Sequence, residues 1–130
     1  MTDKLKKILY VEDDEDIAQI VLMTLEEFGG FETKHCISGA DALQELPKFL
    51  PQLVLMDMMM PVMDGLELFN RMKKIDKIKD IPVIFVTAKM QAKEQQSYLD
   101  VGAIGVIVKP FDPEKLCDTI NAIWQKAQGK

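Results

Sequence analysis

Five polar side chains of this 130-residue chain stand at the ends of four short apolar segments, and together they suit one kind of chemistry. They comprise three carboxylates, a hydroxyl and an ammonium: Glu12, Asp13, Asp57, Thr87 and Lys109. A carboxylate such as that of Asp57 can attack phosphorus and carry an acyl phosphate. A hydroxyl and a fixed ammonium can bind the phosphoryl oxygens. The set therefore predicts transfer of a phosphoryl group at a divalent cation.

Three carboxylates at one place require a cation. Two carboxylates about 4 Å apart repel each other by roughly 4 kcal/mol at an effective dielectric constant of ~20. Mg2+ is a hard ion that accepts one or two carboxylates together with phosphate and water, and Mn2+ takes similar oxygen ligands. A dinucleotide or P-loop site would need glycines beside the first strand, whereas residues 12–16 are all acidic. The sequence therefore predicts Mg2+ (or Mn2+) as the cofactor.

Each polar residue also has an ordinary structural interpretation when it is taken alone. Acids at 12–16 suit the start of a helix, and Asp57 can simply open a loop. Thr87 is common in strands, and Lys109 can extend to the surface. All four segment ends would have to carry suitable chemistry by accident, so the combination favours the phosphoryl site.

The segments that precede these side chains predict a parallel sheet. Residues 8–11, 53–56, 83–86 and 106–108 are continuously apolar, which is typical of strands covered on both faces. Apolar residues at helical spacing lie between them and indicate an α/β fold of alternating strands and helices. Because the carboxyl ends of parallel strands meet at one edge, we expect the polar side chains to converge there.

Local signals indicate where the helices begin and end. Ser38 is a suitable N-cap for the second helix, whose exit is bracketed by Pro47 and Pro51. Asp64 begins a capping-box-like start for the third, and Asp112 precedes a proline at the first position of the last. The segment 89–99 is helical in composition, but it has few apolar residues to bury. It is therefore either a solvent-exposed helix or a candidate for motion or partner binding.

Composition limits the class of protein. The chain is 48% hydrophobic and 28% charged, as expected for one globular domain. Its net charge of -5 argues against direct binding of nucleic acid. We find no apolar run long enough for a signal peptide or a membrane span, so we expect a cytoplasmic protein without membrane contact. Cys36 and Cys117 lack metal-site spacing and are expected to be buried reduced thiols, and His35 is expected to be structural or surface-exposed.

The chain resembles the receiver domain of bacterial two-component response regulators over residues 6 to about 124. The acidic pair, the phosphoacceptor aspartate, the hydroxyl with its small neighbour and the lysine-proline pair all occur in the family's order. Two loops also match closely. The matching motifs are Glu12-Asp13, Asp57, Met60-Pro61-Val62-Met63-Asp64-Gly65, Thr87-Ala88 and Lys109-Pro110-Phe111.

The resemblance implies a fold and a set of ligands. The fold is a single domain over residues 1–130, a doubly wound, flavodoxin-like (βα)5 arrangement with a five-stranded parallel sheet of order 2-1-3-4-5. Asp13 and Asp57 would ligate Mg2+ directly, with Glu12 acting largely through water. The backbone carbonyl of Met59 would complete the protein ligands.

The resemblance also implies the reaction. Asp57 would accept a phosphoryl group from a phosphohistidine of a sensor histidine kinase or histidine phosphotransfer protein. Thr87 and Lys109 would hold the phosphoryl oxygens beside the small Ala88, and the bond before Pro110 would be cis. Catalysis would consist of positioning and charge stabilisation. The chain would thus catalyse only its own phosphorylation and dephosphorylation, and would not be an enzyme in the usual sense.

The resemblance also implies an output face, formed by the last two helices and the strand between them, which would bind a downstream protein or a second copy in a homodimer.

One departure from the family concerns this output. The family usually has Tyr or Phe three residues before the conserved lysine, and here that residue is Val106. We therefore predict that output relies more on the loop and helix after Thr87, including Lys89, Met90 and Tyr98.

Two other functions remain as alternatives. The first is an interaction module that keeps the fold but works without phosphorylation, although none of its site residues is lost. The second is a Mg2+-dependent phosphohydrolase acting on small phosphate esters through Asp57. Such enzymes need a second acid two residues after the nucleophile, where this chain has Met59.

Overall fold

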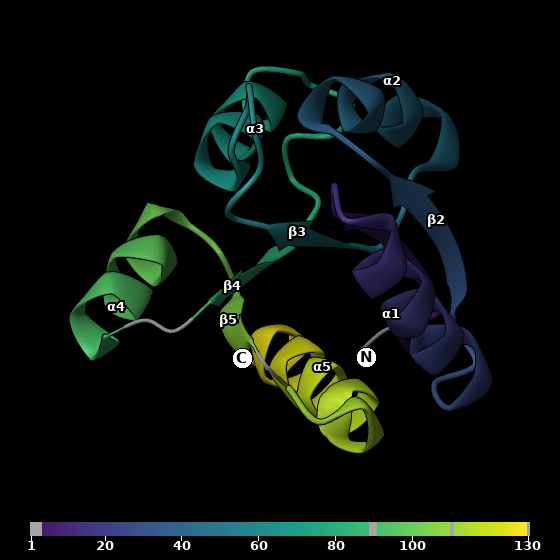
Figure 1. Cartoon of the computed structure of the whole chain (residues 1–130). Coiled ribbons are helices and arrows are strands. Elements are labelled where there is room, and N and C mark those ends of the chain that lie inside the picture. Colours follow the sequence, from purple (N-terminus) through teal and green to yellow (C-terminus); the bar gives the residue numbers. More distant parts are fainter. Residues whose placement is uncertain (1–3, 89–90, 110, 130) are drawn as a thin grey trace.

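The computed structural model describes residues 4–88, 91–109 and 111–129, and strands alternate with helices along these ranges (Figure 1). The strands are β1 (Lys7–Val11), β2 (Glu32–Cys36), β3 (Leu53–Asp57), β4 (Val83–Ala88) and β5 (Gly105–Lys109). The helices are α1 (Glu15–Glu27), α2 (Gly39–Phe49), α3 (Gly65–Met72), α4 (Ala92–Val101) and α5 (Pro113–Gln128).

The strands form one parallel sheet in the order β2-β1-β3-β4-β5, which confirms the flavodoxin-like arrangement. Both faces are covered, as continuous apolar strands require. Alternate strand residues point to opposite faces, so Tyr10 packs with α1 and α5 while Leu9 and Val11 pack with α2 and α3. The two apolar layers fix β1 and β3 in the centre, and with them the side chains at their ends.

The predicted helix starts are confirmed. Ser38 accepts a hydrogen bond from the N–H of Asp41 at the start of α2, and Asp64 accepts one from Glu67 at the start of α3. Asp112 caps α5 ahead of its N-terminal proline. These caps satisfy backbone N–H groups that have no partner within the helix.

The exit of α2 lies between Pro47 and Pro51, as the sequence predicted. The helix continues through Pro47 to Phe49 and ends at Leu50, which has a left-handed φ of 49°. Proline removes its own N–H from the helix and its ring crowds the carbonyl four residues earlier, yet the N–H of Leu50 still donates to the carbonyl of Leu46 at 2.9 Å. The buried Leu46 holds this last turn against the sheet.

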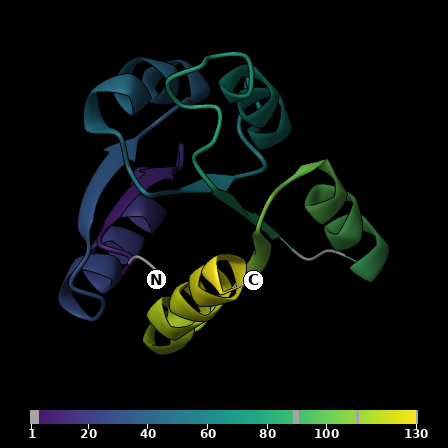
Figure 2. The same cartoon turned by 180° about the vertical axis from the view of Figure 1, so that it is seen from behind.

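Helix α4 is exposed as its composition predicted, and none of its residues is buried. Both views place it at the end of the sheet beyond β4 and β5 (Figures 1 and 2). Its main inward contact is the ring of Tyr98, whose centroid lies 5.3 Å from that of Phe85. Three earlier expectations, for Lys89, Met90 and the bond before Pro110, lie outside the described residues.

Cys36 and Cys117 are free and buried, in agreement with the sequence. Burial raises the pKa of the Cys36 thiol to about 12, with a further contribution from the nearby charge of Asp41. A thiol with so high a pKa is unreactive, so Cys36 serves as a small core residue. Among the described helices, none is long and apolar enough to cross a membrane.

Candidate functional site

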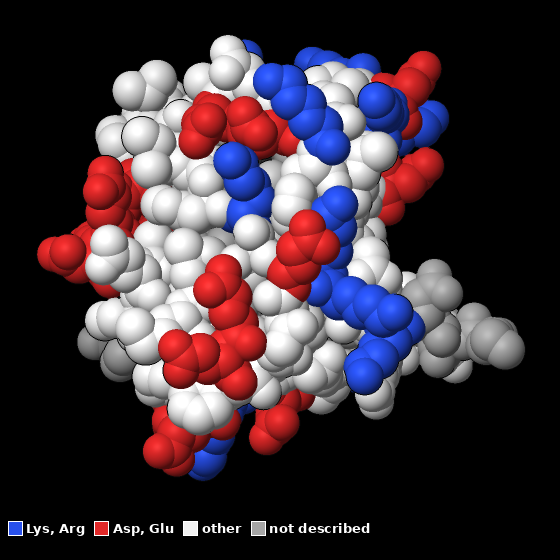
Figure 3. All heavy atoms as spheres, turned by 90° about the vertical axis from the view of Figure 1, so that its right-hand side faces the viewer, with Lys and Arg blue, Asp and Glu red and all other residues white. Residues whose placement is uncertain are grey.

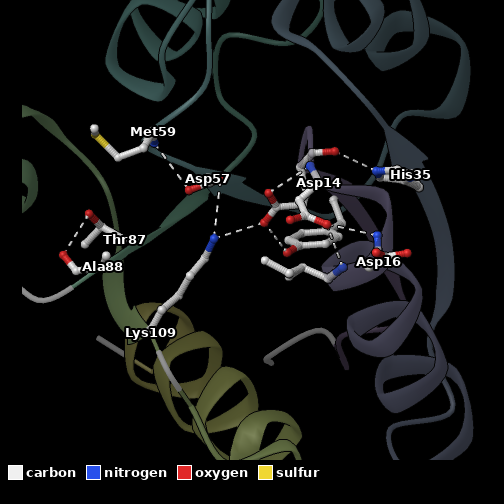
Figure 4. Close-up of polar contacts among 11 residues, drawn as sticks. Asp14, Asp16, His35, Asp57, Met59, Thr87, Ala88 and Lys109 are labelled. Carbon is white, nitrogen blue, oxygen red and sulfur yellow. Dashed lines mark hydrogen bonds and ion pairs between the residues drawn. The ribbon is translucent and has the colours of Figure 1, made fainter.

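The carboxyl ends of β1, β3 and β5 bring four of the predicted side chains together, and Figure 4 shows the side chain of Lys109 directed at Asp57. The Nζ atom of Lys109 lies 3.1 Å from Oε1 of Glu12 and 3.4 Å from Oδ2 of Asp57. Ligand oxygens of Glu12, Asp13 and Asp57 all lie within 4.8 Å of one another. Strands distant in the chain thus place three acids and one ammonium at a single point.

Burial divides the three acids into two kinds. Glu12 and Asp57 are only 1% and 3% exposed, whereas Asp13 is exposed to solvent. Oxygens of these three carboxylates, grouped within 4.8 Å of one another, form a donor set suited to a hard divalent cation. The residues present therefore fit the Mg2+ that the sequence predicted, and Asp13 lies on the side from which an ion can enter.

The surroundings of Asp57 disfavour its ionised form relative to its protonated form. Burial is the main reason that its pKa rises from 3.8 to about 6, and the neighbouring Glu12 adds to the effect. Lys109 and the backbone N–H of Met59, which donates to Oδ1 of Asp57 at 3.3 Å, act in the opposite direction. A buried carboxylate with a raised pKa gains from any added positive charge. This is the electrostatic situation in which a cation binds favourably.

Glu12 and Lys109 stabilise each other's charged forms. Burial alone would raise the pKa of Glu12, but hydrogen bonds from Lys109 and from the N–H of Asp14 outweigh it, and the pKa is lowered. Burial would likewise lower the pKa of Lys109, yet the hydrogen bond to Glu12 and the charge of Asp57 raise it. Lys109 therefore remains an ammonium between two carboxylates.

Thr87 and Ala88 occupy the end of β4, next to the strand that carries Asp57. Thr87 is 2% exposed, and its hydroxyl lies 3.5 Å from the carbonyl oxygen of Ala88 instead of contacting the acids. The Ala88 residue is exposed, and its short side chain leaves the edge beside Lys109 open. The structure thus places both residues at the predicted edge, with the hydroxyl outside the acidic cluster.

The other predicted ligand and the remaining acids have different positions. Met59 follows Asp57 and contributes its N–H to that carboxylate, while its own side chain is 71% exposed. A role for the Met59 carbonyl stays a prediction. Asp14 caps α1, and Glu15 and Asp16 lie in the first helical turn, so these three acids serve the helix.

Two contacts to Glu12 were not predicted from the sequence. The phenol of Tyr10 donates to Oε1 of Glu12 at 2.9 Å, and Nε2 of His35 lies 2.8 Å from its backbone carbonyl. Tyr10 lies two residues before Glu12, and residues two apart share a strand face, which was the available signal. His35 contacts a site residue through the register that pairs it with Tyr10.

The loop after Asp57 is held close to α3 by a glycine. A Cβ atom on Gly65 would lie 2.7 Å from the carbonyl oxygen of Asp57 and 2.9 Å from Cα of Met58. The N–H of Gly65 also donates to the carbonyl of Met58 at 2.9 Å. Only a residue without a side chain allows the helix to pack against the backbone that carries the acceptor aspartate.

We expect Gly65→Ala to lower the free energy of unfolding by about 1–3 kcal/mol, because the new methyl group forces backbone apart. Gly39→Ala is a matched control, since Gly39 also begins a helix but its Cβ would meet only the flexible side chain of Met63. Urea denaturation of both variants measures the difference. Equal losses of stability in the two variants would show that the backbone of Asp57 does not exclude a side chain at position 65.

Comparison with known proteins decides the family. The family model described as "Response regulator receiver domain" matches residues 8–121. The chain belongs to the response regulator receiver domain family. Receiver domains are signalling domains of two-component systems and not classical enzymes, and a site with acids grouped around one central aspartate agrees with that assignment.

Similar proteins share this domain. The chemotaxis protein CheY4 of Vibrio cholerae has a TM-score of 0.83 and 32% identity, with 92% of this chain and 99% of that chain covered. The phosphate regulon regulator PhoB of Escherichia coli is 31% identical over 93% of this chain and 52% of its own length. The probable transcriptional regulator ycf29 of Porphyra purpurea is 36% identical over 91% and 56%. This receiver domain thus spans about half the length of PhoB and of ycf29.

Proposed function

We propose that this receiver domain is a phosphorylation switch in which Asp57 accepts a phosphoryl group from a phosphohistidine. The observation that carries the proposal is the position of Asp57. It ends a central, fully buried strand, its pKa is raised by burial, its Oδ2 atom lies 3.4 Å from the ammonium of Lys109, and its carboxylate is grouped with those of Glu12 and Asp13. A candidate nucleophile, a candidate cation site and a positive charge thus lie side by side.

The chemistry follows from these positions. An oxygen of Asp57 forms a bond to phosphorus as the bond between phosphorus and the donor histidine nitrogen breaks, and the leaving imidazole takes up a proton. Lys109 and the hydroxyl of Thr87 hold the phosphoryl oxygens. Mg2+ held by Glu12, Asp13, Asp57 and the carbonyl of Met59 would neutralise charge on the acids and the phosphoryl group. The transferring group needs little covalent help, so positioning and electrostatics supply the catalysis.

Output is proposed to pass through the face of α4, β5 and α5. Val106 lies on this face and lines a groove of about 540 Å³ together with Leu99 and Ile123. An aromatic side chain at this position would occupy part of that groove, which Val106 leaves open. The absence of that ring at position 106 supports a response that depends on Thr87 and on the weakly packed α4.

The proposed partners are proteins. The donor is a sensor histidine kinase or a histidine phosphotransfer protein, and the target is a downstream protein or a second copy of the chain. Direct contact with nucleic acid is not proposed, because the chain has a net charge of -5 and acidic groups stand among the basic ones on the face that carries β2 (Figure 3). We propose that residues 1–130 act as a single receiver unit.

A small-molecule phosphodonor tests the proposal. Incubation with acetyl phosphate and Mg2+ is expected to add one phosphoryl group to the intact mass, and chelation of Mg2+ should reduce the rate at least about 100-fold. Failure to gain mass at any donor or metal concentration would contradict the proposal and favour the phosphorylation-independent module. Continuous release of phosphate from unrelated esters would instead favour the phosphohydrolase.

A further inference from the structure

The buried phenol of Tyr10 has no role in the proposed mechanism. Tyr10 lies one residue before the end of β1 and is 0% exposed, packed in the apolar layer between the sheet and helices α1 and α5. Its hydroxyl donates to Oε1 of Glu12 at 2.9 Å. A buried phenol needs a hydrogen-bond partner, but this partner is a member of the acidic cluster. The contact therefore links the core directly to the site.

Glu12 is restrained at each of its polar groups. Its Oε1 atom accepts from Tyr10 and from Lys109, and its Oε2 atom accepts from the N–H of Asp14 at 3.2 Å. Its backbone carbonyl lies 2.8 Å from Nε2 of His35, and Figure 4 shows His35 directed at this backbone from β2. Both side-chain oxygens and the main chain are thus fixed before any ligand is present.

The two donors on Oε1 differ in how firmly they are held. Lys109 is 21% exposed, has a flexible stem, and is shared between Glu12 and Asp57. Because its ammonium also serves the phosphoryl group in the proposed reaction, it cannot be reserved for Glu12. Tyr10 is enclosed on all sides by the core and has two rotatable bonds, so its hydroxyl stays where the fold places it.

We propose that Tyr10 is a positioning residue, which holds the carboxylate of Glu12 in the orientation that the cation requires. This inference rests on the proposed function, since it concerns the same Mg2+ site. Groups that hydrogen-bond a metal ligand typically change metal affinity by about 10–100-fold when they are removed. Tyr10 thereby sets the concentration of Mg2+ at which the switch can be phosphorylated.

The variant Tyr10→Phe tests the inference, because it keeps the ring and removes only the hydroxyl. Calorimetric titration with Mg2+ is expected to show affinity reduced by about tenfold or more. The rate of phosphoryl uptake from acetyl phosphate should depend on a correspondingly higher Mg2+ concentration and approach the wild-type rate when Mg2+ is saturating. A general loss of structure would instead lower the maximal rate and the melting temperature.

Thr33→Val is a matched control. Thr33 also lies in the sheet and its hydroxyl also donates to a glutamate, Glu26, at 2.5 Å, but this pair is exposed and away from the acidic cluster. The substitution keeps the side-chain shape and removes one hydroxyl. It is expected to leave the Mg2+ affinity at the wild-type value.

A double-mutant cycle makes the inference specific to Glu12. In a Glu12→Gln background, Tyr10→Phe should change Mg2+ affinity far less than in the wild type, because the two effects share one carboxylate. Equal effects in both backgrounds, or wild-type affinity in Tyr10→Phe, would overturn the positioning role while leaving the proposed function intact. Absence of Mg2+ binding by the wild-type chain would overturn both.

Discussion

Replacing Asp57 by asparagine will abolish phosphoryl uptake and, without Mg2+, will make the folded chain more stable at pH 7. The first effect follows because the amide is not a nucleophile toward phosphorus, whereas the carboxylate is. The second follows from burial of the charge. Asp57 is 3% exposed beside Glu12, and within the part of the chain that the structure describes these two acids share one ammonium, that of Lys109.

The stability effect has a definite dependence on pH. Burial, with the charge of Glu12, raises the pKa of Asp57 from 3.8 to about 6, so between about pH 4 and pH 6 the native state retains a proton that the unfolded chain releases. The free energy of unfolding therefore falls as pH rises through this window. A pKa that differs by about two between the two states corresponds to about 3 kcal/mol. The Asp57→Asn protein has no carboxyl group at position 57 to ionise, so its free energy of unfolding does not fall in this way. It should be about 1–3 kcal/mol more stable than the wild type at pH 7 and equally stable near pH 4.

Urea denaturation of both proteins between pH 4 and pH 8 measures this difference. Mg2+ should reduce the difference in free energy of unfolding between the wild type and Asp57→Asn at pH 7, because an ion that binds the native wild type stabilises it. Asp76→Asn is the matched control, since the side chain of Asp76 is 99% exposed and its removal should change neither stability nor uptake. A stability gap that stayed constant across the pH range would contradict the burial of charge at Asp57.

Replacing Lys109 by methionine will slow phosphoryl uptake by about 100–1,000-fold, which is the usual loss when one preorganised group that stabilises transferring charge is removed. It will also destabilise the Mg2+-free protein by about 3 kcal/mol, because Glu12 and Asp57 lose the only ammonium that the described residues place between them. Added Mg2+ should restore much of the stability, and the slow uptake should persist, because the cation replaces the charge but not the contact with the phosphoryl group.

Lys34→Met separates this effect from the general loss of a lysine. Lys34 pairs with Glu45 at 3.8 Å on the surface, and its side chain is 44% exposed, so its removal should cost under about 1 kcal/mol. Stopped-flow measurement of uptake and urea denaturation, each with and without Mg2+, compare the two variants. Uptake by Lys109→Met within about threefold of the wild type would contradict the catalytic role of this ammonium.

The site could be predicted where one local rule was enough. Asp57 and Lys109 each follow a continuous apolar run, and parallel strands bring the ends of such runs to one edge. Their approach to 3.4 Å is therefore a consequence of the sequence pattern. The position of Thr87 at this edge followed in the same way. The direction of its hydroxyl, toward the carbonyl of Ala88, did not, because a side-chain rotamer depends on neighbours that the pattern leaves unspecified.

Other features depend on tertiary contacts that no local pattern reveals. Tyr10 stands in an apolar run and resembles a core residue, which it also is, so its hydrogen bond to Glu12 was missed. The contact of His35 with Glu12 requires the register between β1 and β2. The two prolines placed the exit of α2 between residues 47 and 51, whereas its end at Phe49 within that interval depends on how the last turn packs.

Locating the modified residue shows whether Asp57 itself receives the phosphoryl group. After incubation with acetyl phosphate and Mg2+, borohydride reduction converts an aspartyl phosphate into homoserine, which peptide mass spectrometry assigns to one position. If Asp57 is the acceptor, homoserine appears at position 57 and at no other aspartate. Modification at Asp13, or a phosphoryl group that resists borohydride because it is carried by Thr87 or His35, would contradict it.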